Sequence, residues 1–334
     1  MKVGLNRKLC LLAGIAVLLC IYVLQLVFTG RSQIKDLSFK DEVEEILIQT
    51  HDGEIRISRD GVKSENEAYS WTVSDGTSSY VAAGAVADGM ADSLQNLKLL
   101  GLATKSAGAD AARYGLDDGA KIVVTAYAGG KPVRVVTVGK NTSTNSQSYI
   151  QVDGSDAVYI VGETLHGTFS KTVDDIRSKS IYSVESKEIS SVQISSEKDS
   201  FTVVKKTEAA PAGNEGETAV QKDSWTLIRS DGSSLGEGEE LDDDKVSSWI
   251  SSLAVLTCSG YLADDALVPA PDGAISLEIT VPGKTIKVKL FANGDEEATS
   301  YVMQSSESPY LFTVASYVKA RFDKSVADFV KAKE

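Results

Sequence analysis

The sequence is poor in the residue types that most often build reactive centres. It has two histidines and three cysteines in 334 residues. Cys10 and Cys20 belong to an apolar N-terminal stretch, which leaves Cys258 alone in the rest of the chain and excludes a disulfide framework there. No histidine or basic residue is adjacent to Cys258, so we expect a buried small side chain rather than a thiol nucleophile.

The two histidines are far apart in the sequence. His51 is predicted in the turn of a hairpin, and His166 in a loop that follows a strand and is flanked by glycine. We expect both to be exposed loop residues, because neither has the clustered partners that zinc requires or the nucleophile and acid of a catalytic triad. The sequence therefore predicts neither a zinc enzyme nor a histidine-based hydrolase.

Basic residues are also scarce. The chain has 34 Lys and Arg against 47 Asp and Glu, a net charge of −13. Binding to a polyanion needs a basic stripe, so nucleic acid is excluded as a partner. The excess of acid is typical of a soluble, exported body.

The acidic residues include two adjacent pairs, Asp117-Asp118 and Asp174-Asp175. Neighbouring carboxylates point to opposite faces of a strand and splay apart on a helix, so neither pair by itself forms the two-carboxylate site of a glycosidase. We expect both pairs at turns or helix caps.

Nucleotide and calcium sites are predicted to be absent. Gly139-Lys140 resembles a phosphate loop only faintly, since Arg134 replaces the opening glycine and Asn141 the magnesium-binding hydroxyl. The acidic turns 153–156 and 293–297 lack the alternating ligands of a calcium loop. We therefore predict no catalytic, cofactor-binding or metal-ligating residue, no cofactor, and a protein that is not an enzyme.

An uncharged apolar segment occupies residues 9–28. Twenty helical residues span roughly 30 Å, the thickness of a hydrocarbon core, so the segment predicts a transmembrane anchor. Three basic residues precede it, against Arg31 and Lys35 just after it, which favours a cytoplasmic N-terminus at 1–8 and an extracytoplasmic body. The expected location is the cell inner (cytoplasmic) membrane, crossed once. A signal peptide cleaved near Thr29-Gly30 and a lipid-modified Cys20 are the alternatives.

The remainder of the chain repeats itself. Trp71 and Trp225 are 154 residues apart, and so are the turns that begin at Asp118 and Asp272. Earlier in each half the separation is 146, so the second half has an insertion, which we place in the Gly-, Glu- and Pro-bearing stretch 208–218. Trp71 and Trp225 recur beside alternating apolar residues, and we expect them and Trp249 in the core rather than stacked on a sugar.

Each half predicts antiparallel hairpins and one principal helix. In the first half, hairpins are expected around His51-Asp52-Gly53, Gly129-Gly130 and Asp153-Gly154, and a helix at 82–100 with an apolar stripe at intervals of three and four. In the second, Asp242-Asp243-Asp244 is expected to cap the helix. The predicted fold is α+β: an N-terminal transmembrane helix, then two tandem duplicated α+β domains at 29–183 and 184–334 with mainly antiparallel sheets.

Several short segments carry a resemblance to a known family. They are Leu100-Gly101-Leu102, Tyr114-Gly115-Leu116-Asp117, Val138-Gly139, Ser148-Tyr149, Val158-Tyr159 and Asp175-Ile176-Arg177-Ser178-Lys179. On these residues the chain resembles the membrane-anchored bacterial family of unknown function whose domains accompany gliding-motility-type ABC transporters as an auxiliary extracytoplasmic part. Asp118 stands where that family usually has proline, and the second half has Ala270-Pro271-Asp272 in place of the Gly-Leu-Asp triplet.

The resemblance implies a role but no chemistry, since the family brings no catalytic residue. It implies a non-enzymatic, membrane-anchored, extracytoplasmic accessory or scaffold protein, with the membrane and the permease and ATPase subunits of an ABC-type transporter as partners. A binding module for cell-envelope glycan or another ligand is the alternative. A hydrolase that uses Asp117 and Asp118 is a third hypothesis.

Overall fold

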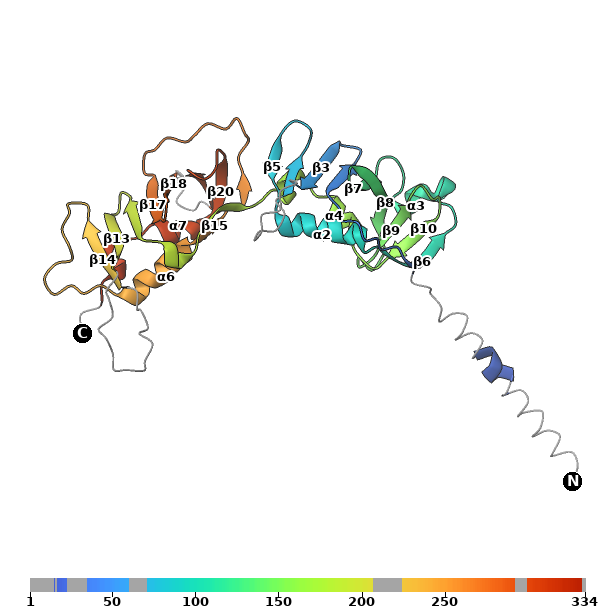
Figure 1. The fold of residues 1–334 in the computed structure, drawn as a ribbon, viewed down its shortest axis with the longest axis horizontal. Coiled ribbons are helices and arrows are strands. Elements are labelled where there is room, and N and C mark those ends of the chain that lie inside the picture. The colour runs from blue at the N-terminus through green and yellow to red at the C-terminus, as the bar shows by residue number, and fades with distance from the viewer. Residues whose placement is uncertain are drawn as a thin grey trace, which may run out of the picture. The chain divides into compact units, whose positions relative to one another are not determined.

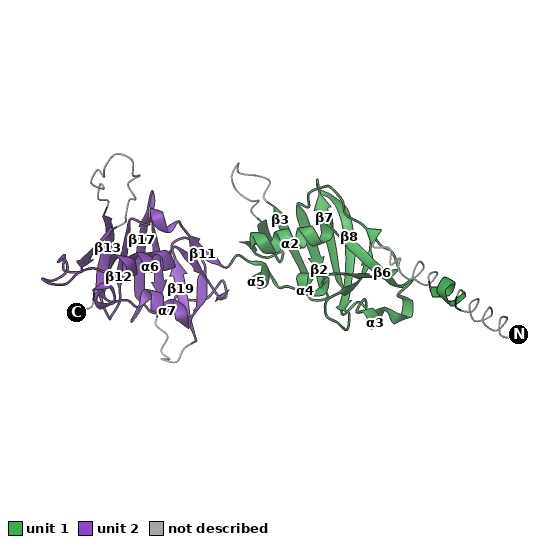
Figure 2. Ribbon diagram, turned by 90° about the horizontal axis from the view of Figure 1, so that it is seen from below, with its two compact units in different colours: residues 1–178 green, residues 179–334 purple. Residues whose placement is uncertain are grey.

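The computed structural model describes residues 15, 17–22, 35–59, 71–206, 224–291 and 299–331. It divides the chain into two compact units, residues 1–178 (unit 1) and 179–334 (unit 2), shown in Figure 2. Each unit has its own hydrophobic core. The division falls five residues before the boundary expected at 183/184.

The predicted fold class is wrong in two respects. The class α+β does not describe the two units, which consist mainly of antiparallel sheet, because the helices are short and the residues after the principal helix form a strand. In addition, no helix among the described residues is long and apolar enough to cross a membrane. In the segment 9–28 the described residues, 15 and 17–22, are helical. The other residues of 9–28 lie outside the described part.

Unit 1 contains a ten-stranded antiparallel sheet in the order β1-β6-β10-β9-β8-β7-β2-β3-β4-β5, visible in Figure 1. Its strands are β1 (Lys35–Asp36), β2 (Glu45–Gln49), β3 (Glu54–Arg59), β4 (Trp71–Ser74), β5 (Ser79–Val81), β6 (Lys98–Thr104), β7 (Ile122–Ala128), β8 (Lys131–Asn141), β9 (Ser148–Val152) and β10 (Val158–Val161). The three hairpins predicted from the sequence are confirmed as β2–β3, β7–β8 and β9–β10. Gly129 and Gly130 have φ of 57° and 70°, the left-handed pair that a two-residue hairpin turn requires.

Unit 2 contains an eight-stranded sheet in the order β14-β13-β12-β17-β18-β19-β20-β16, and a separate two-stranded sheet of β11 and β15. Its strands are β11 (Ser180–Ser183), β12 (Ser191–Ser195), β13 (Ser200–Lys206), β14 (Ser224–Arg229), β15 (Val255–Thr257), β16 (Gly260–Tyr261), β17 (Ile275–Val281), β18 (Lys284–Leu290), β19 (Ser300–Ser305) and β20 (Leu311–Ala315). The insertion expected at 208–218 lies outside the described residues.

The two sheets have the same strand order. Starting from the β16 edge, the strands β16, β20, β19, β18, β17, β12, β13 and β14 take the places of β6, β10, β9, β8, β7, β2, β3 and β4. The short strands correspond as well: Lys35 faces Leu99 in the β1–β6 pair, and Tyr182 faces Leu256 in the β11–β15 pair. The continuous strand β6 of unit 1 is thus divided into β15 and β16 in unit 2.

Helices cover one face of each sheet, and Figure 2 shows α2 and α6 lying across the strands. They are α2 (Gly84–Gln95), α3 (Ala111–Tyr114), α4 (Leu165–Phe169) and α5 (Val173–Ile176) in unit 1, and α6 (Asp243–Leu253) and α7 (Ser316–Phe322) in unit 2. Three short 3-10 helices occur at η1 (Gly108–Asp110), η2 (Ser186–Glu188) and η3 (Val326–Phe329). Met90 and Leu94 of α2 are fully buried against the sheet, as their spacing predicts.

Each principal helix is hydrogen-bonded to one tryptophan of the sheet, and α6 also has a side-chain cap. The predicted cap of α6 is confirmed, since the Asp242 carboxylate accepts a hydrogen bond from the Lys245 backbone N–H at 3.1 Å. Trp71 donates its indole N–H to Asp88 of α2 at 2.8 Å, and Trp225 donates to Ser247 of α6 at 3.0 Å. Both rings are buried, which confirms their predicted core position and ties the fourth strand of each repeat to the helix above it.

Candidate functional site

The residues that carry the family resemblance pack backbone against backbone. Gly115 ends α3 with φ of 68°, and a Cβ there would lie 2.7 Å from the Lys140 backbone nitrogen. A Cβ on Gly139 would lie 2.2 Å from the Tyr114 carbonyl oxygen. The two glycines therefore let the α3 turn lie directly on β8. Leu116 is buried in the same small cluster, so this motif is structural.

The two acidic pairs occupy turns and caps, as predicted. Asp118 forms an ion pair with Lys121 at 2.5 Å, and hydrogen bonding from this lysine, with its charge, lowers the pKa of the Asp118 carboxyl. Asp174 lies 3.2 Å from the buried guanidinium of Arg177. Asp175 accepts a hydrogen bond from the Thr172 backbone N–H at 2.9 Å in a capping box that begins α5. Three of the four carboxylates thus already have structural partners.

The structure brings the two histidines together. Both line one surface hollow of about 520 Å³ at the end of the unit 1 sheet, which we call the histidine hollow. His51 is at the tip of the β2–β3 hairpin and His166 is in the first turn of α4. The hollow is completed by the following residues: Thr50, Asp52, Gly53, Glu54, Ile55, Asp75, Thr77, Gly119, Ala120, Lys121, Ile122, Ser170, Lys171, Thr172 and Val173.

The prediction that both histidines are exposed loop residues is confirmed for His51 and wrong for His166. His51 is exposed, as expected, but His166 is half-buried and helical rather than part of an exposed loop. Leu165 and Phe169 are buried one helical turn apart, and this i, i+4 pair holds α4 against the sheet and sets the direction of His166. That apolar pair was the available signal for the helix. Nothing in the sequence indicated that the two imidazoles would share a hollow.

Donor groups in the histidine hollow lack partners, whereas most of its carboxylates have them. Within the described part of the chain, the side chains of His51, His166 and Lys171 make no hydrogen bond or ion pair. Glu54 lies 3.5 Å from Arg56. Asp75 accepts the Ser78 and Thr77 backbone N–H groups at 2.9 and 2.8 Å, and these bonds lower the pKa of its carboxyl.

The hydrogen bonds of the β2–β3 hairpin tip join residues of the tip to one another. Thr50 donates its backbone N–H to the Gly53 carbonyl at 2.9 Å, and Asp52 donates its N–H to the Thr50 hydroxyl at 3.2 Å. Among the described residues, no hydrogen bond or ion pair joins Asp52 or Gly53 to the α4–α5 connection. The space between the hairpin and that connection therefore stays open.

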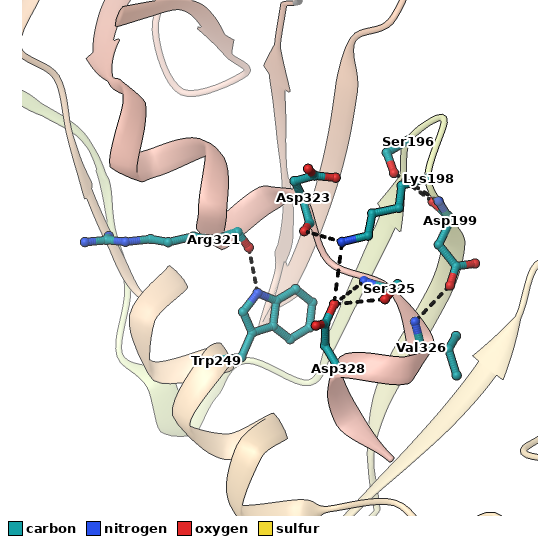
Figure 3. A network of polar contacts seen from close by, with 9 residues as sticks. All are labelled: Ser196, Lys198, Asp199, Trp249, Arg321, Asp323, Ser325, Val326 and Asp328. Carbon is teal, nitrogen blue, oxygen red and sulfur yellow. Dashed lines mark hydrogen bonds and ion pairs between the residues drawn. The ribbon is translucent and has the colours of Figure 1, made fainter. Parts of the chain in front are cut away.

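In unit 2 a polar network, drawn in Figure 3, ties the equivalent hairpin tip to the α7–η3 connection, beside a surface hollow of about 620 Å³ that Asp199 and Val326 also line. Asp199, at the tip of the β12–β13 hairpin, accepts the Val326 backbone N–H at 2.8 Å. Lys198 donates to the Asp323 carbonyl at 3.5 Å and lies 4.0 Å from the Asp328 carboxylate. The repeat separations of 146 and 153 place Asp199 at the position of Gly53 and Val326 at that of Val173. The carboxylate that binds this backbone N–H in unit 2 is therefore missing from unit 1.

Asp328 anchors this network. Its carboxylate accepts hydrogen bonds from the Ser325 backbone N–H at 2.8 Å and from the Ser325 hydroxyl at 2.9 Å, in the capping box of η3. Burial raises the pKa of the Asp328 carboxyl, but these hydrogen bonds and the charge of Lys198 outweigh it and leave the pKa below its usual range. Thr172 and Asp175 form the same capping box in unit 1.

A second surface hollow, of about 740 Å³, lies beside the network in unit 2. Trp249 borders it, donates its indole N–H to the Arg321 carbonyl at 2.8 Å, and packs on Phe329 with ring centroids 4.9 Å apart. Because Trp249 is only 5% exposed, its ring has no free face on which a sugar could stack. The prediction that it is a core residue is confirmed. Cys258, also predicted as a core residue, is buried too.

Metal ligands do not gather in either hollow. Across the described ranges, no group of three or more His, Cys, Asp or Glu side chains is placed to hold an ion. The histidine hollow is suited instead to forming hydrogen bonds with a polar ligand, because imidazole and ammonium groups line it without protein partners.

The fold and this site define a protein of two tandem, antiparallel, β-rich domains, one with a polar hollow that both histidines line and one in which the corresponding hairpin tip is hydrogen-bonded to the facing connection. The chain belongs to the family described as Domain of unknown function (DUF4340), whose profile matches residues 71–274, or 204 of the 334 residues. The match runs from β4 of unit 1 to the turn before β17 of unit 2 and includes the Gly115 and Gly139 motifs. Comparison with curated proteins and with solved structures gives no match.

Proposed function

We propose that this protein is a non-enzymatic, extracytoplasmic accessory protein that scaffolds or contacts an ABC-type transporter at the cytoplasmic membrane. The transporter association comes from the resemblance of the first half to domains that accompany gliding-motility-type ABC transporters. Membership of a family of unknown function is compatible with this role but does not specify it.

One observation carries the non-enzymatic part of the proposal. The residues that make the chain recognisable have packing and capping roles: Gly115 and Gly139 allow close backbone contact, and Asp175 caps α5. In an enzyme family we expect recognisable residues to include groups that face the substrate. Here they support the sheet, which favours a scaffold.

An exposed apolar loop supports a protein partner. Leu267 and Val268 are 89% and 54% exposed, in the connection between β16 and β17. The equivalent connection of unit 1 contains η1 and α3, and Leu116 there is buried. The repeat separation of 154 places Leu267 at the position of the exposed Arg113, so unit 2 presents an apolar side chain where unit 1 presents a charged one, and this difference suits contact with a permease subunit.

Co-purification from mild detergent tests the proposal. We expect the tagged full chain to recover permease and ATPase subunits, and the double variant Leu267→Ser, Val268→Ser to recover at least tenfold less. Tyr317→Ser, which changes an exposed aromatic residue on α7, is the matched control and should leave recovery unchanged. Failure to recover either subunit in several detergents, with chemical crosslinking before solubilisation, contradicts the proposal.

The histidine hollow supports a second function, a binding module for cell-envelope glycan or another polar ligand. The supporting observation is the set of unpartnered donors around the hollow. Sedimentation of the protein with isolated envelope glycan is the test. We expect His166→Ala to reduce the bound fraction, and no sedimentation above background would exclude glycan as the ligand.

A further inference from the structure

We infer that the histidine hollow of unit 1 is a binding site for a small ligand that bears an oxyanion, phosphate or carboxylate. The inference rests on the second function above for the location of the ligand, and it adds the chemical class. It does not depend on association with a transporter.

The first step is the comparison between the two units. In unit 2 the hairpin tip is tied to the α7–η3 connection by the Asp199 carboxylate, which accepts the Val326 N–H at 2.8 Å. In unit 1 the corresponding residue is Gly53, which has no side chain, and the corresponding backbone is that of Val173. The unit 2 site thus already holds a carboxylate of its own chain, in the place where unit 1 has free space.

The second step is the balance of donors and acceptors in the hollow. Among its acidic side chains, Asp75 is occupied by two backbone N–H groups and Glu54 is close to Arg56. Among its basic side chains, Lys121 is paired with Asp118. The side chains without a hydrogen-bond or ion-pair partner in the described part of the chain include two imidazoles, each with at least one N–H donor, the Lys171 ammonium group and the Asp52 carboxylate. Two imidazoles and one ammonium group around a single hollow are best satisfied by an acceptor that carries negative charge.

The third step is the position of these donors. His166 and Lys171 belong to the α4–α5 region and are half-buried, whereas His51 is exposed at the hairpin tip. The donors therefore come from both sides of the hollow, and a bound oxyanion would bridge the hairpin and the α4–α5 connection. In unit 2 the Asp199 carboxylate joins the equivalent two segments, by its hydrogen bond with the Val326 N–H. Asp52 also lines the hollow and opposes an anion, so its removal should tighten binding.

The test uses the imidazole nitrogen NMR signals of the full chain, which has only two histidines and therefore two sets of signals. Inorganic phosphate is titrated at fixed pH and ionic strength, with chloride as the compensating anion. We expect both sets to shift with one saturation curve. His51→Gln and His166→Gln assign the signals, and backbone amide spectra confirm that each variant is folded.

Variants separate the site from general electrostatic effects. We expect Lys171→Ala to weaken phosphate binding at least tenfold and Asp52→Asn to strengthen it. Lys324→Ala changes the lysine at the equivalent position of unit 2, 153 residues later, and should leave the curve unchanged.

Three results would overturn the inference: no shift of either imidazole, a shift of only one, or curves that Lys171→Ala leaves unchanged. A second titration uses a neutral N-acetylglucosamine trimer in place of phosphate. It separates an error in the oxyanion assignment from the absence of any ligand binding in the hollow. If the trimer shifts both imidazoles and phosphate does not, the hollow binds a ligand but the oxyanion assignment is wrong. If neither probe shifts them, the second function fails as well.

Discussion

At the residue scale, the contact between Gly139 and the α3 turn allows no extra atom. A β-carbon on Gly139 would lie 2.2 Å from the Tyr114 carbonyl oxygen and 3.2 Å from the Leu116 side chain. We expect Gly139→Ala to lower the free energy of unfolding of unit 1 by about 3 kcal/mol, since strand and turn must move apart. Denaturant unfolding followed by Trp71 fluorescence, with Trp225 and Trp249 replaced by Phe, measures it.

Gly89 is the matched control. It lies in the middle of α2, and a β-carbon there meets nothing within 4 Å. Gly89→Ala should therefore stabilise unit 1 by about 1 kcal/mol, the usual gain in helix propensity. If both substitutions changed the free energy of unfolding by the same amount, the close contact at Gly139 would not contribute to the stability of unit 1.

The capping box of η3 gives a prediction with a defined pH dependence. Asp328→Ala removes the acceptor of two hydrogen bonds from Ser325, and we expect a loss of about 1 kcal/mol in unit 2 at pH 7. Because the pKa of the folded-state carboxyl lies below its unfolded value of about 3.9, this stabilisation is complete above pH 5 and disappears as pH falls through the folded-state pKa.

Urea titrations of the two proteins at pH 7 and pH 2.5 measure this effect, with Asp323→Ala as control. Among the described residues the Asp323 carboxylate has no hydrogen bond or ion pair. Only the Asp323 backbone carbonyl accepts from Lys198, as Figure 3 shows, and the alanine variant keeps that carbonyl. A stability difference between wild type and Asp328→Ala that is the same at both pH values would contradict the assignment.

At the scale of elements, one hairpin tip of unit 2 holds the connection that precedes η3. Asp199→Ala removes the acceptor for the Val326 N–H while leaving the β12–β13 pairing in place. We expect the Val326 amide to exchange with solvent at least tenfold faster, because local opening no longer breaks a charge-assisted hydrogen bond.

Amide hydrogen exchange followed by NMR makes the measurement, and Lys205→Ala, in the same strand pair but away from the tip, is the control. Unchanged protection of Val326 in Asp199→Ala would show that the connection is held by packing alone.

The elements themselves were predictable where local pattern and tertiary packing agree. Hairpins with two-glycine or Asp-Gly turns follow from the left-handed backbone that those residues adopt readily. The helix predicted at 82–100 is right up to Gln95 and wrong beyond it. The Asn96 side chain donates to Asp92 and ends the helix, and Leu97 and Leu99 are buried from a turn and from β6 instead. Spacing at three and four cannot distinguish these two ways of burying leucine.

The site was less predictable than the elements. His51 and His166 are 115 residues apart, and only the sheet order, with β2 beside β7 and α4 packed on β7 and β8, brings their ends of the unit together. Carboxylate pairs, by contrast, were assigned correctly to turns and caps, since such roles depend on near neighbours. Local roles can be read from a single sequence, but a site assembled from distant loops needs the topology.

At the scale of the whole molecule, the two units have separate cores, one formed by residues between Val43 and Ile176 and the other by residues between Ile181 and Phe329. We expect residues 179–334, produced alone, to fold with the backbone chemical shifts they have in the full chain. The corresponding measurement is an amide NMR spectrum of the fragment overlaid on that of the intact protein. Broad or collapsed signals would show that unit 2 depends on unit 1.

The shared strand order has a consequence for biosynthesis. The two domains have the same strand order. During folding, a hairpin of one domain can therefore pair with the corresponding strand of the other domain instead of its own. Such exchanged assemblies are a characteristic failure of tandem repeats. Divergence at the paired positions, for example Trp71 with Arg59 in one copy and Trp225 with Lys205 in the other, makes the exchanged pairs differ from the native ones. Sequence divergence between the two units therefore disfavours strand pairing between them during folding.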